Sequence, residues 1–408
     1  MQAHHLGLAM LLVATTAPAC VEPADSSDYS DSGDVLDGKA DASVPGTAMS
    51  WRRISTVKSV PTTPLAAGKF RVHMIDVGTG LSILIQGADF TMLYDGGSGD
   101  DRAGITHVGN TIKNGNRLLA YLFAALGPSG PKECTPDGDN WPQIDRPKIR
   151  LDHVFLSHPH EDHDSLLDNV VDCYDVRDVW DSGDDNNREG YANFMTAVTA
   201  VTDVTYHNAA GRKPLEQINV FHSMLTLPSN TVAMNEDDEI ALGAGASLKL
   251  LHVDGRQTQD ENLNSTVVRV ELGKTVMLLA GDEESGPRLP PASNPGQIEA
   301  DLIARQSDQL KADIYQVAHH GSSTSNRLAF LAKVQPKIAL LGAGPLPYSG
   351  VVLPETSVVD AIKGLASHPI LLRTDLNDKT IASCGGGDRI GNNDSRPGGC
   401  DNFVISIH

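Results

Sequence analysis

Four candidate metal ligands, His158, His160, Asp162 and His163, lie within one six-residue segment of this 408-residue chain. The segment reads His158-Pro159-His160-Glu161-Asp162-His163 and follows an apolar run, residues 154–157, that predicts a buried strand. A loop at a strand end can bring side chains to one point, and imidazole and carboxylate are ligands suited to zinc. The spacing predicts that His158 and His160 share one metal while Asp162 and His163 face a second.

Two further apolar runs also end in candidate ligands. Asp282 follows the run 275–280, where its two oxygens could bridge two cations, although it could also cap the next segment. His319 and His320 follow the run 314–318. We assign His319 to the second metal and His320 to substrate contact or general acid catalysis, the alternative being a capped turn. Three strand ends that deliver such residues to one edge favour a metal site.

The composition is that of a globular protein with an acidic surface. Hydrophobic residues make up 40% of the chain, and the formal net charge is −20. An anionic protein repels polyanions at long range, which counts against tight non-specific binding of nucleic acid. A bound dication reverses the local field, so this argument is weaker for an active site.

The N-terminus is typical of an exported protein. Residues 1–19 contain a short apolar run that is too short to span a bilayer and ends in Ala17-Pro18-Ala19 before Cys20, which indicates a signal peptide. Residues 20–66, rich in Asp, Ser, Gly and Ala, predict an acidic disordered tether. Cys20 is then the lipid attachment site of a cell-envelope lipoprotein, or the first residue of a secreted protein. The remaining residues, 67–408, form one domain.

Five cysteines leave one unpaired in an exported chain. Lipidation of Cys20 would remove the odd one and leave two local pairs, Cys134–Cys173 and Cys384–Cys400. Four buried free thiols are the alternative. The chain has no Cys-x-x-Cys motif, so a cysteine zinc site is not expected.

Strand and helix patterns follow one another in a regular order from residue 69 onward. Alternating or continuous apolar runs predict strands at 70–75, 82–86, 90–94, 154–157, 175–180, 248–253, 266–272, 275–280, 314–318, 338–341 and 370–373. Apolar residues at helical spacing predict helices at 117–126, 191–199, 328–334 and 354–365. In each half the strands come first and then alternate with helices, which predicts an α/β (α+β) fold, specifically an αββα sandwich.

Further motifs accompany the candidate ligands in a characteristic order. They are Asp76-Val77-Gly78, Asp95-Gly96-Gly97, Asn264-Ser265, Gly281-Asp282, His319-His320-Gly321-Ser322 and Arg373-Thr374-Asp375. With the histidine segment, they resemble the metallo-β-lactamase superfamily, and within it the hydrolase domain attached to the competence protein ComEC, over residues 72–383. The resemblance implies two zinc ions, with manganese or iron as alternatives. It implies the ligands His158, His160, Asp162, His163, Asp282 and His319.

The resemblance also assigns supporting roles. Asp95 would support the metal-binding segment from outside the ligand set, and Asn264 and Ser322 would bind substrate oxygens. The chain departs from the family at Thr79-Gly80-Leu81, at Asp164-Ser165-Leu166 and after Tyr348, where a His-Pro pair is absent. A third histidine for the first metal has no clear position, the candidates being His207, His222 and His252. The metal core therefore matches better than the surroundings that select substrate.

These observations predict an exported hydrolase that uses a metal-bridging hydroxide, with Asp162 and His320 as catalytic residues. The expected substrates are phosphodiesters or related esters, either small phosphoesters or nucleic acid, and DNA is the first to test by resemblance. A carboxyl-ester or lactone hydrolase of the cell envelope is one alternative. A non-catalytic metal-binding lipoprotein is another. We expect membrane contact through the lipid anchor and predict no protein partner.

Overall fold

The computed structural model describes most of the chain beyond residue 40. The described ranges are 41–97, 117–136, 141–184, 187–256, 260–344, 347–348, 350–377, 390 and 399–408. The expected signal peptide and Cys20 lie outside these ranges and stay predictions. Within the described ranges, no helix is long and apolar enough to cross a membrane.

The first sheet has ten strands and contains both ends of the described chain. The strand order is β1-β2-β19-β3-β4-β5-β6-β7-β8-β11. Pairing is antiparallel from β1 through β5 and parallel from β5 to β11. The bounds are β1 Ala42–Ser43, β2 Met49–Ile54, β3 Phe70–Met74, β4 Ile83–Gln86, β5 Thr91–Tyr94, β6 Arg150–Phe155, β7 Asp175–Asp181, β8 Thr205–Asn208, β11 Asn230–Ala233 and β19 Asn402–Ile407.

The second sheet has seven strands in sequence order, from β12 to β18. Pairing is antiparallel up to β15 and parallel from there. The bounds are β12 Glu239–Gly243, β13 Ala246–His252, β14 Val267–Leu272, β15 Thr275–Leu279, β16 Ile314–Gln316, β17 Ile338–Leu341 and β18 Ile370–Arg373. A separate hairpin, β9 Gln217–Val220 with β10 Ser223–Thr226, forms a two-stranded sheet.

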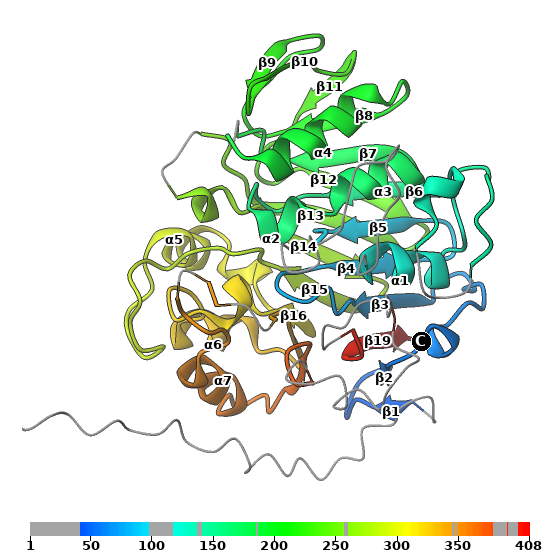
Figure 1. Cartoon of the computed structure of the whole chain (residues 1–408). Helices are drawn as coiled ribbons and strands as arrows, with labels where there is room; N and C mark the ends of the chain where they lie inside the picture. The colour runs from blue at the N-terminus through cyan, green and yellow to red at the C-terminus, as the bar shows by residue number, and fades with distance from the viewer. Residues whose placement is uncertain are drawn as a thin grey trace, which may run out of the picture. The chain divides into compact units, whose positions relative to one another are not determined.

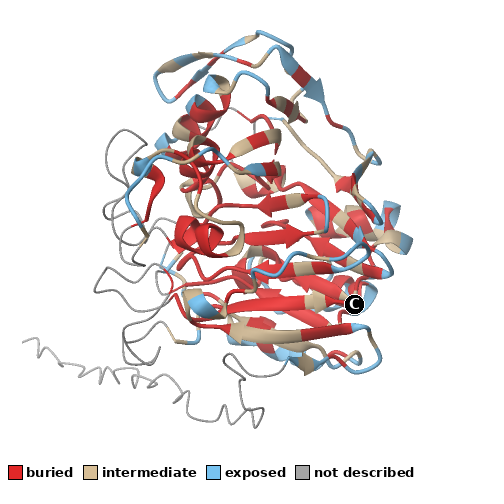
Figure 2. Ribbon diagram, turned by 90° about the vertical axis from the view of Figure 1, so that its right-hand side faces the viewer, coloured by how far each residue is buried: buried red, intermediate tan, exposed pale blue. Residues whose placement is uncertain are grey.

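Helices cover the outer face of each sheet. The α-helices are α1 Arg117–Ala125, α2 Glu161–Asp164, α3 Leu167–Cys173, α4 Glu189–Ala200, α5 Gln297–Arg305, α6 Leu328–Val334 and α7 Thr356–Lys363. One core joins α1, α3 and α4 to the first sheet, and another joins α5, α6 and α7 to the second (Figure 1). A third core lies between the sheets. Figure 2 shows the buried residues concentrated along these strands and inner helix faces.

The alternation of side chains along a strand explains the layers. Leu93 of β5 joins the core under the helices, while Met92 and Tyr94 on either side of it join the core between the sheets. Both faces are apolar because both are covered, as the continuous apolar runs predict. The structure thus has the predicted αββα sandwich.

The predicted tether, residues 20–66, extends too far. Strand β2 pairs with β19 along its whole length, with Met49 opposite Ile407 and Ile54 opposite Asn402. The domain therefore starts before residue 67. The last acidic residue of the stretch that predicts disorder is Asp41, and the six residues of β2 are too few to dominate a composition argument.

The predicted disulfide between Cys134 and Cys173 is present. Cys400 is disulfide-bonded as well, and its predicted partner, Cys384, lies outside the described residues. The first bond connects the turn after α1 to the C-terminal end of α3 and is completely buried. It therefore fastens two helical segments of the same outer layer.

Candidate metal centre

The parallel parts of both sheets deliver the candidate ligands. Strand β6 ends at Phe155, and the chain then passes through His158 and His160 into the short helix α2, which carries Asp162 and His163. Asp282 follows β15, and His320 follows β16. Strands β15 and β16 are parallel neighbours, so the loops after them leave the second sheet at the same edge. The loop after β6 of the first sheet meets them there.

Four side chains form one group that could hold a metal ion. They are Asp162, His163, Asp282 and His320, and one potential ligand atom from each lies within 4.8 Å of the other three. His320 Nε2 is 3.0 Å from Asp162 Oδ2 and 3.2 Å from Asp282 Oδ2. His163 Nε2 is 3.3 Å from Asp282 Oδ1 and 3.2 Å from His320 Nε2.

The hydrogen bonds on the far sides of the two imidazoles determine which nitrogen faces the group. His163 Nδ1 donates to Asp95 Oδ2 at 2.8 Å, and His320 Nδ1 donates to the carbonyl oxygen of Gly342 at 2.7 Å. In their neutral forms, both rings therefore turn a lone pair on Nε2 toward the two carboxylates. Asp282 Oδ1 is buried and has no hydrogen bond. Lone pairs that converge in this way fit a cation, and two imidazoles with two carboxylates suit zinc.

The electrostatic field at the group favours positive charge. Burial acts to lower the pKa of His320, but Asp282 and Asp162 outweigh burial and raise it to about 10. Burial is likewise outweighed at His163, whose pKa is held well above its ordinary value by Asp282, Asp95 and Asp162. A field that retains a proton on buried imidazoles would also stabilise a bound dication.

His158 and His160 form a second, smaller arrangement. His158 Nε2 lies 3.0 Å from His160 Nδ1, so the two rings face each other across the distance that a shared metal would occupy. Burial, together with the nearby His163 and His160, holds the pKa of His158 well below its ordinary value. A neutral imidazole is the form that binds metals. The predicted pairing of His158 with His160 has the geometry for one metal position.

The structure favours His320 over His319 as a ligand of the second position, which differs from our sequence assignment. His319 Nε2 is 3.8 Å from Asp282 Oδ2, while its Nδ1 is 3.0 Å from both Glu284 Oε1 and Thr324 Oγ1. His319 and His320 both have left-handed backbone conformations, with φ of 48° and 51°. Two consecutive residues of this kind turn the chain so that His320 enters the group and His319 stays at its edge.

Asp95, for which the sequence predicts a supporting role, lies against the candidate ligand His163. It is completely buried and accepts hydrogen bonds from the backbone N–H of Ser157, from Ser157 Oγ and from His163 Nδ1. One carboxylate thus connects the end of β6 to a ligand imidazole, which fixes the orientation of that ring.

Asn264 and Ser322, the predicted substrate-binding residues, instead make internal contacts. Asn264 Nδ2 donates to the carbonyl oxygens of Asp254 and Arg256. Ser322 Oγ is 2.8 Å from Thr324 Oγ1. Both side chains are completely buried, so their positions suit the support of loops better than contact with substrate.

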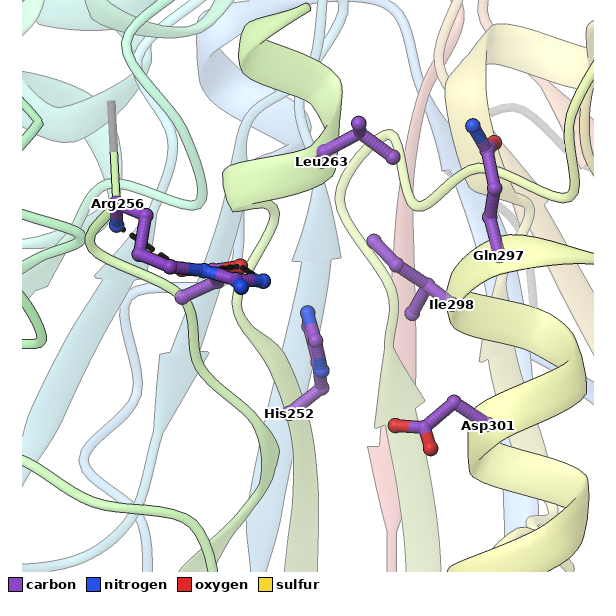
Figure 3. Close-up of a pocket in the computed structure, with 7 residues that line it drawn as sticks. His252, Arg256, Leu263, Gln297, Ile298 and Asp301 are labelled. Carbon is purple, nitrogen blue, oxygen red and sulfur yellow. Dashed lines mark hydrogen bonds and ion pairs between the residues drawn. The ribbon is translucent and has the colours of Figure 1, made fainter. Parts of the chain in front are cut away.

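The three candidates for a third histidine lie elsewhere. His207 stacks on Trp180 at a ring distance of 3.6 Å, and His222 follows β9 in the turn of the small hairpin. His252 lies beside a cavity of about 260 Å³ that Leu263 and Asp301 also line (Figure 3). Among the described residues, none of the three forms a hydrogen bond, ion pair or ring contact with His158 or His160.

The cavity in Figure 3 adjoins another group of potential ligands, Glu236, His252 and Asp301. Arg305 already pairs with the carboxylates of Glu236 and Asp301 through its guanidinium group. A cation would compete with that fixed positive charge. We therefore interpret this group as an ion-pair network and place the metal centre at the sheet edge.

Two glutamates near the candidate metal centre do not belong to any of the predicted ligand motifs. Glu261 Oε2 is 3.1 Å from His160 Nε2, and Glu284 Oε1 is 3.0 Å from His319 Nδ1. Glu261 directly precedes Asn262-Leu263-Asn264-Ser265, and Glu284 comes two residues after Asp282. Their proximity to two recognised motifs is the only sequence signal for either residue.

The sequence matches a known protein family and parts of known proteins. A model of the Metallo-beta-lactamase superfamily matches residues 75–344. The competence protein ComA of Neisseria gonorrhoeae is 29% identical over 134 residues, which are 33% of this chain and 17% of ComA. Recombination protein 2 of Haemophilus influenzae is 34% identical over 100 residues, which are 24% of this chain and 11% of that protein. The matches confirm the resemblance that the motifs predict, and they span less than a fifth of either relative.

The solved structures to which the chain is similar are more distant in sequence. The metallo-beta-lactamase fold protein YhfI from Bacillus subtilis is 12% identical, with a TM-score of 0.37, over 74% of this chain and 95% of YhfI. A putative metal-dependent hydrolase from Parabacteroides distasonis is 10% identical, with a TM-score of 0.34, over 74% of this chain and 92% of that chain.

Proposed function

The chain belongs to the metallo-beta-lactamase superfamily, and from this premise we propose that it is an exported hydrolase of phosphodiester or related ester bonds. The observation that carries the proposal is the group of Asp162, His163, Asp282 and His320, whose ligand atoms converge at one sheet edge. His158 and His160 would provide the first metal position, and this group the second. Zinc is the first metal to test at both, and manganese or iron suits the same ligands.

A bound dication would supply a Lewis acid and lower the pKa of a water molecule at the site to near neutrality. The side chain of Asp162 is 19% exposed, whereas those of His163, Asp282 and His320 are at most 3% exposed. Solvent and substrate therefore reach the group from the Asp162 side. Asp162 can accept a hydrogen bond from the attacking water and orient it toward the ester.

His319 takes the role that the sequence assigns to His320. Its side chain is 15% exposed at the edge of the group, and Glu284 accepts a hydrogen bond from its Nδ1. This places His319 where it could donate a proton to the oxygen of the leaving group. His320 is too deeply buried for that role, because only 1% of its side chain is exposed.

DNA is the first substrate to test, since the relatives include a competence protein. A small ester or lactone is the second candidate, and the charges around the opening favour it. Glu261 and Glu284 lie against the half-buried histidines His160 and His319, and the whole chain has a net charge of −20. These charges would repel a polyanion and would affect a small neutral ester much less.

A substrate panel tests the proposal. The purified protein, loaded with Zn²⁺ or Mn²⁺, would be assayed with bis-p-nitrophenyl phosphate, single-stranded DNA and a lactone, beside Asp162→Ala. We expect hydrolysis of at least one substrate and a loss of roughly 100-fold or more in the variant. Lactone turnover without phosphodiester cleavage selects the second candidate. A metal-loaded protein that is inactive on all three, or a variant as active as the wild type, contradicts the proposed chemistry and favours a non-catalytic metal-binding lipoprotein.

We also propose that the protein acts in the bacterial cell envelope, held to the membrane by a lipid on Cys20. The support is the signal-like N-terminus and the buried disulfide, a bond that forms in oxidising compartments. Fractionation of cells tests this, with membrane association expected for the wild type and lost in Cys20→Ala. Equal fractionation of the two proteins contradicts the anchor.

A further inference from the structure

Glu261 contacts His160, one of the two histidines of the first metal position. It is the first residue of a short 3-10 helix, Glu261–Asn264, between β13 and β14. Its Oε2 lies 3.1 Å from His160 Nε2, while His160 Nδ1 lies 3.0 Å from His158 Nε2. The two nitrogens of His160 therefore have different partners, a carboxylate on one side and an imidazole on the other.

The hydrogen-bond chain around His158 fixes its tautomer. Ser157 Oγ donates its hydrogen to Asp95 Oδ2 at 2.8 Å. It must then accept from His158 Nδ1, which lies 3.0 Å away. His158 Nε2 is left with a lone pair that points toward His160.

The carboxylate of Glu261 does the same for His160. A carboxylate can only accept, so the hydrogen of a neutral His160 resides on Nε2 and its Nδ1 carries the lone pair. Two lone pairs then face each other across 3.0 Å. They repel each other unless a cation lies between them, and the tautomer that Glu261 selects is the one that a metal needs.

We propose that Glu261 is a positioning residue for the first metal position, where it orients His160 as Asp95 orients His163. This rests on the proposed metal-dependent function. Both pairs join a carboxylate oxygen to the imidazole nitrogen remote from the metal position, at 3.1 Å for Glu261 and 2.8 Å for Asp95. Such partners raise the basicity of the ligand and hold the ring in its binding orientation.

The loop that carries Glu261 is held in place before any metal binds. Asp260 accepts a hydrogen bond from the backbone N–H of Asn262. Asn264 donates to two carbonyl oxygens of the preceding segment, at Asp254 and Arg256. The side chain of Glu261 is 20% exposed, as is that of His160. A fixed backbone and a partly desolvated pair allow a single carboxylate to influence metal affinity.

Metal binding by variants tests the role separately from catalysis. We would measure Zn²⁺ bound per chain against buffered free Zn²⁺ for the wild type, Glu261→Ala, Glu261→Gln and the exposed control Glu189→Gln. For Glu261→Ala we expect the affinity for one of the two ions to fall by roughly 10- to 100-fold, with the affinity for the other ion unchanged. Glu261→Gln can still accept a hydrogen bond from His160 and should lose less. Circular dichroism confirms that each variant is folded.

The outcomes separate this inference from the proposed function. A wild type that binds no metal contradicts both. A wild type that binds two ions, with Glu261→Ala binding both equally well, overturns only the role of Glu261. An equal loss in Glu189→Gln would assign the effect to net charge and also overturn it.

Discussion

Glu299 provides a quantitative test of the electrostatics beneath the metal centre. It lies in α5, and burial raises the pKa of its carboxyl group from 4.5 to about 7. Its Oε1 accepts a hydrogen bond from the backbone N–H of Arg327, whereas Oε2 is buried without a hydrogen bond. Glu299→Gln keeps the shape of the side chain and cannot ionise.

The folded protein binds this proton more tightly than the unfolded chain does. The resulting stability is fully present below pH 4.5 and is lost as the pH rises through about 7. The whole pKa shift of Glu299 corresponds to about 3 kcal/mol in the free energy of unfolding. About 2 kcal/mol of this contribution is lost between pH 5.5 and 8.5. Relative to Glu299→Gln, the wild type should therefore lose about 2 kcal/mol of unfolding free energy over that interval.

Urea unfolding at pH 5.5 and 8.5, followed by tryptophan fluorescence, measures this difference for both proteins. A difference between wild type and variant that stays constant with pH to within ~0.5 kcal/mol would refute the assigned pKa and the burial argument behind it.

Three further perturbations have defined outcomes. In Gly80→Ala the new Cβ would lie 2.2 Å from the carbonyl oxygen of Asp162, so we expect weaker metal retention and a lower melting temperature. The control Gly68→Ala has open space around the new Cβ and should show only a small loss of stability. Cys134→Ser removes a disulfide between residues 39 apart in sequence and should lower the free energy of unfolding by about 4 kcal/mol in a denaturant titration. An unchanged midpoint of denaturant unfolding would contradict this. Asp282→Asn should weaken retention of Zn²⁺ against a chelator by roughly 100-fold or more, and full retention would exclude Asp282 as a ligand.

The apolar runs predict most of the fold because both sheets are covered on both faces. Helix α6 and strands β17 and β18 have the predicted bounds. Short or half-exposed elements cannot be predicted from apolar runs in the sequence. Strands β9 and β10 of the hairpin have two apolar residues each, and β2 follows an acidic stretch that obscures its pattern. Strand β19 has four apolar residues among its six, and its place in the sheet depends on pairing with β2 and β3. Pairing with a distant strand, as β2 pairs with β19, stabilises such segments and leaves no local signal.

The candidate site, like the fold, could be predicted from the sequence only where its residues adjoin buried apolar strands. His158 to His163 and Asp282 could be found because each comes directly after a buried strand. The choice between His319 and His320 could not be made, because it depends on the left-handed conformations of both residues. Glu261 is recognisable only once the fold brings the loop after β13 against His160.

The central claim is that Asp162, His163, Asp282 and His320 hold a metal ion, with His319 outside the ligand set. The direct measurement is the metal content of the wild type, His320→Ala and His319→Ala after Zn²⁺ loading and dialysis. The structure predicts at least one ion per chain in the wild type and in His319→Ala, and a loss of roughly ten-fold or more in affinity for His320→Ala. Full retention by His320→Ala, or a loss confined to His319→Ala, would contradict it.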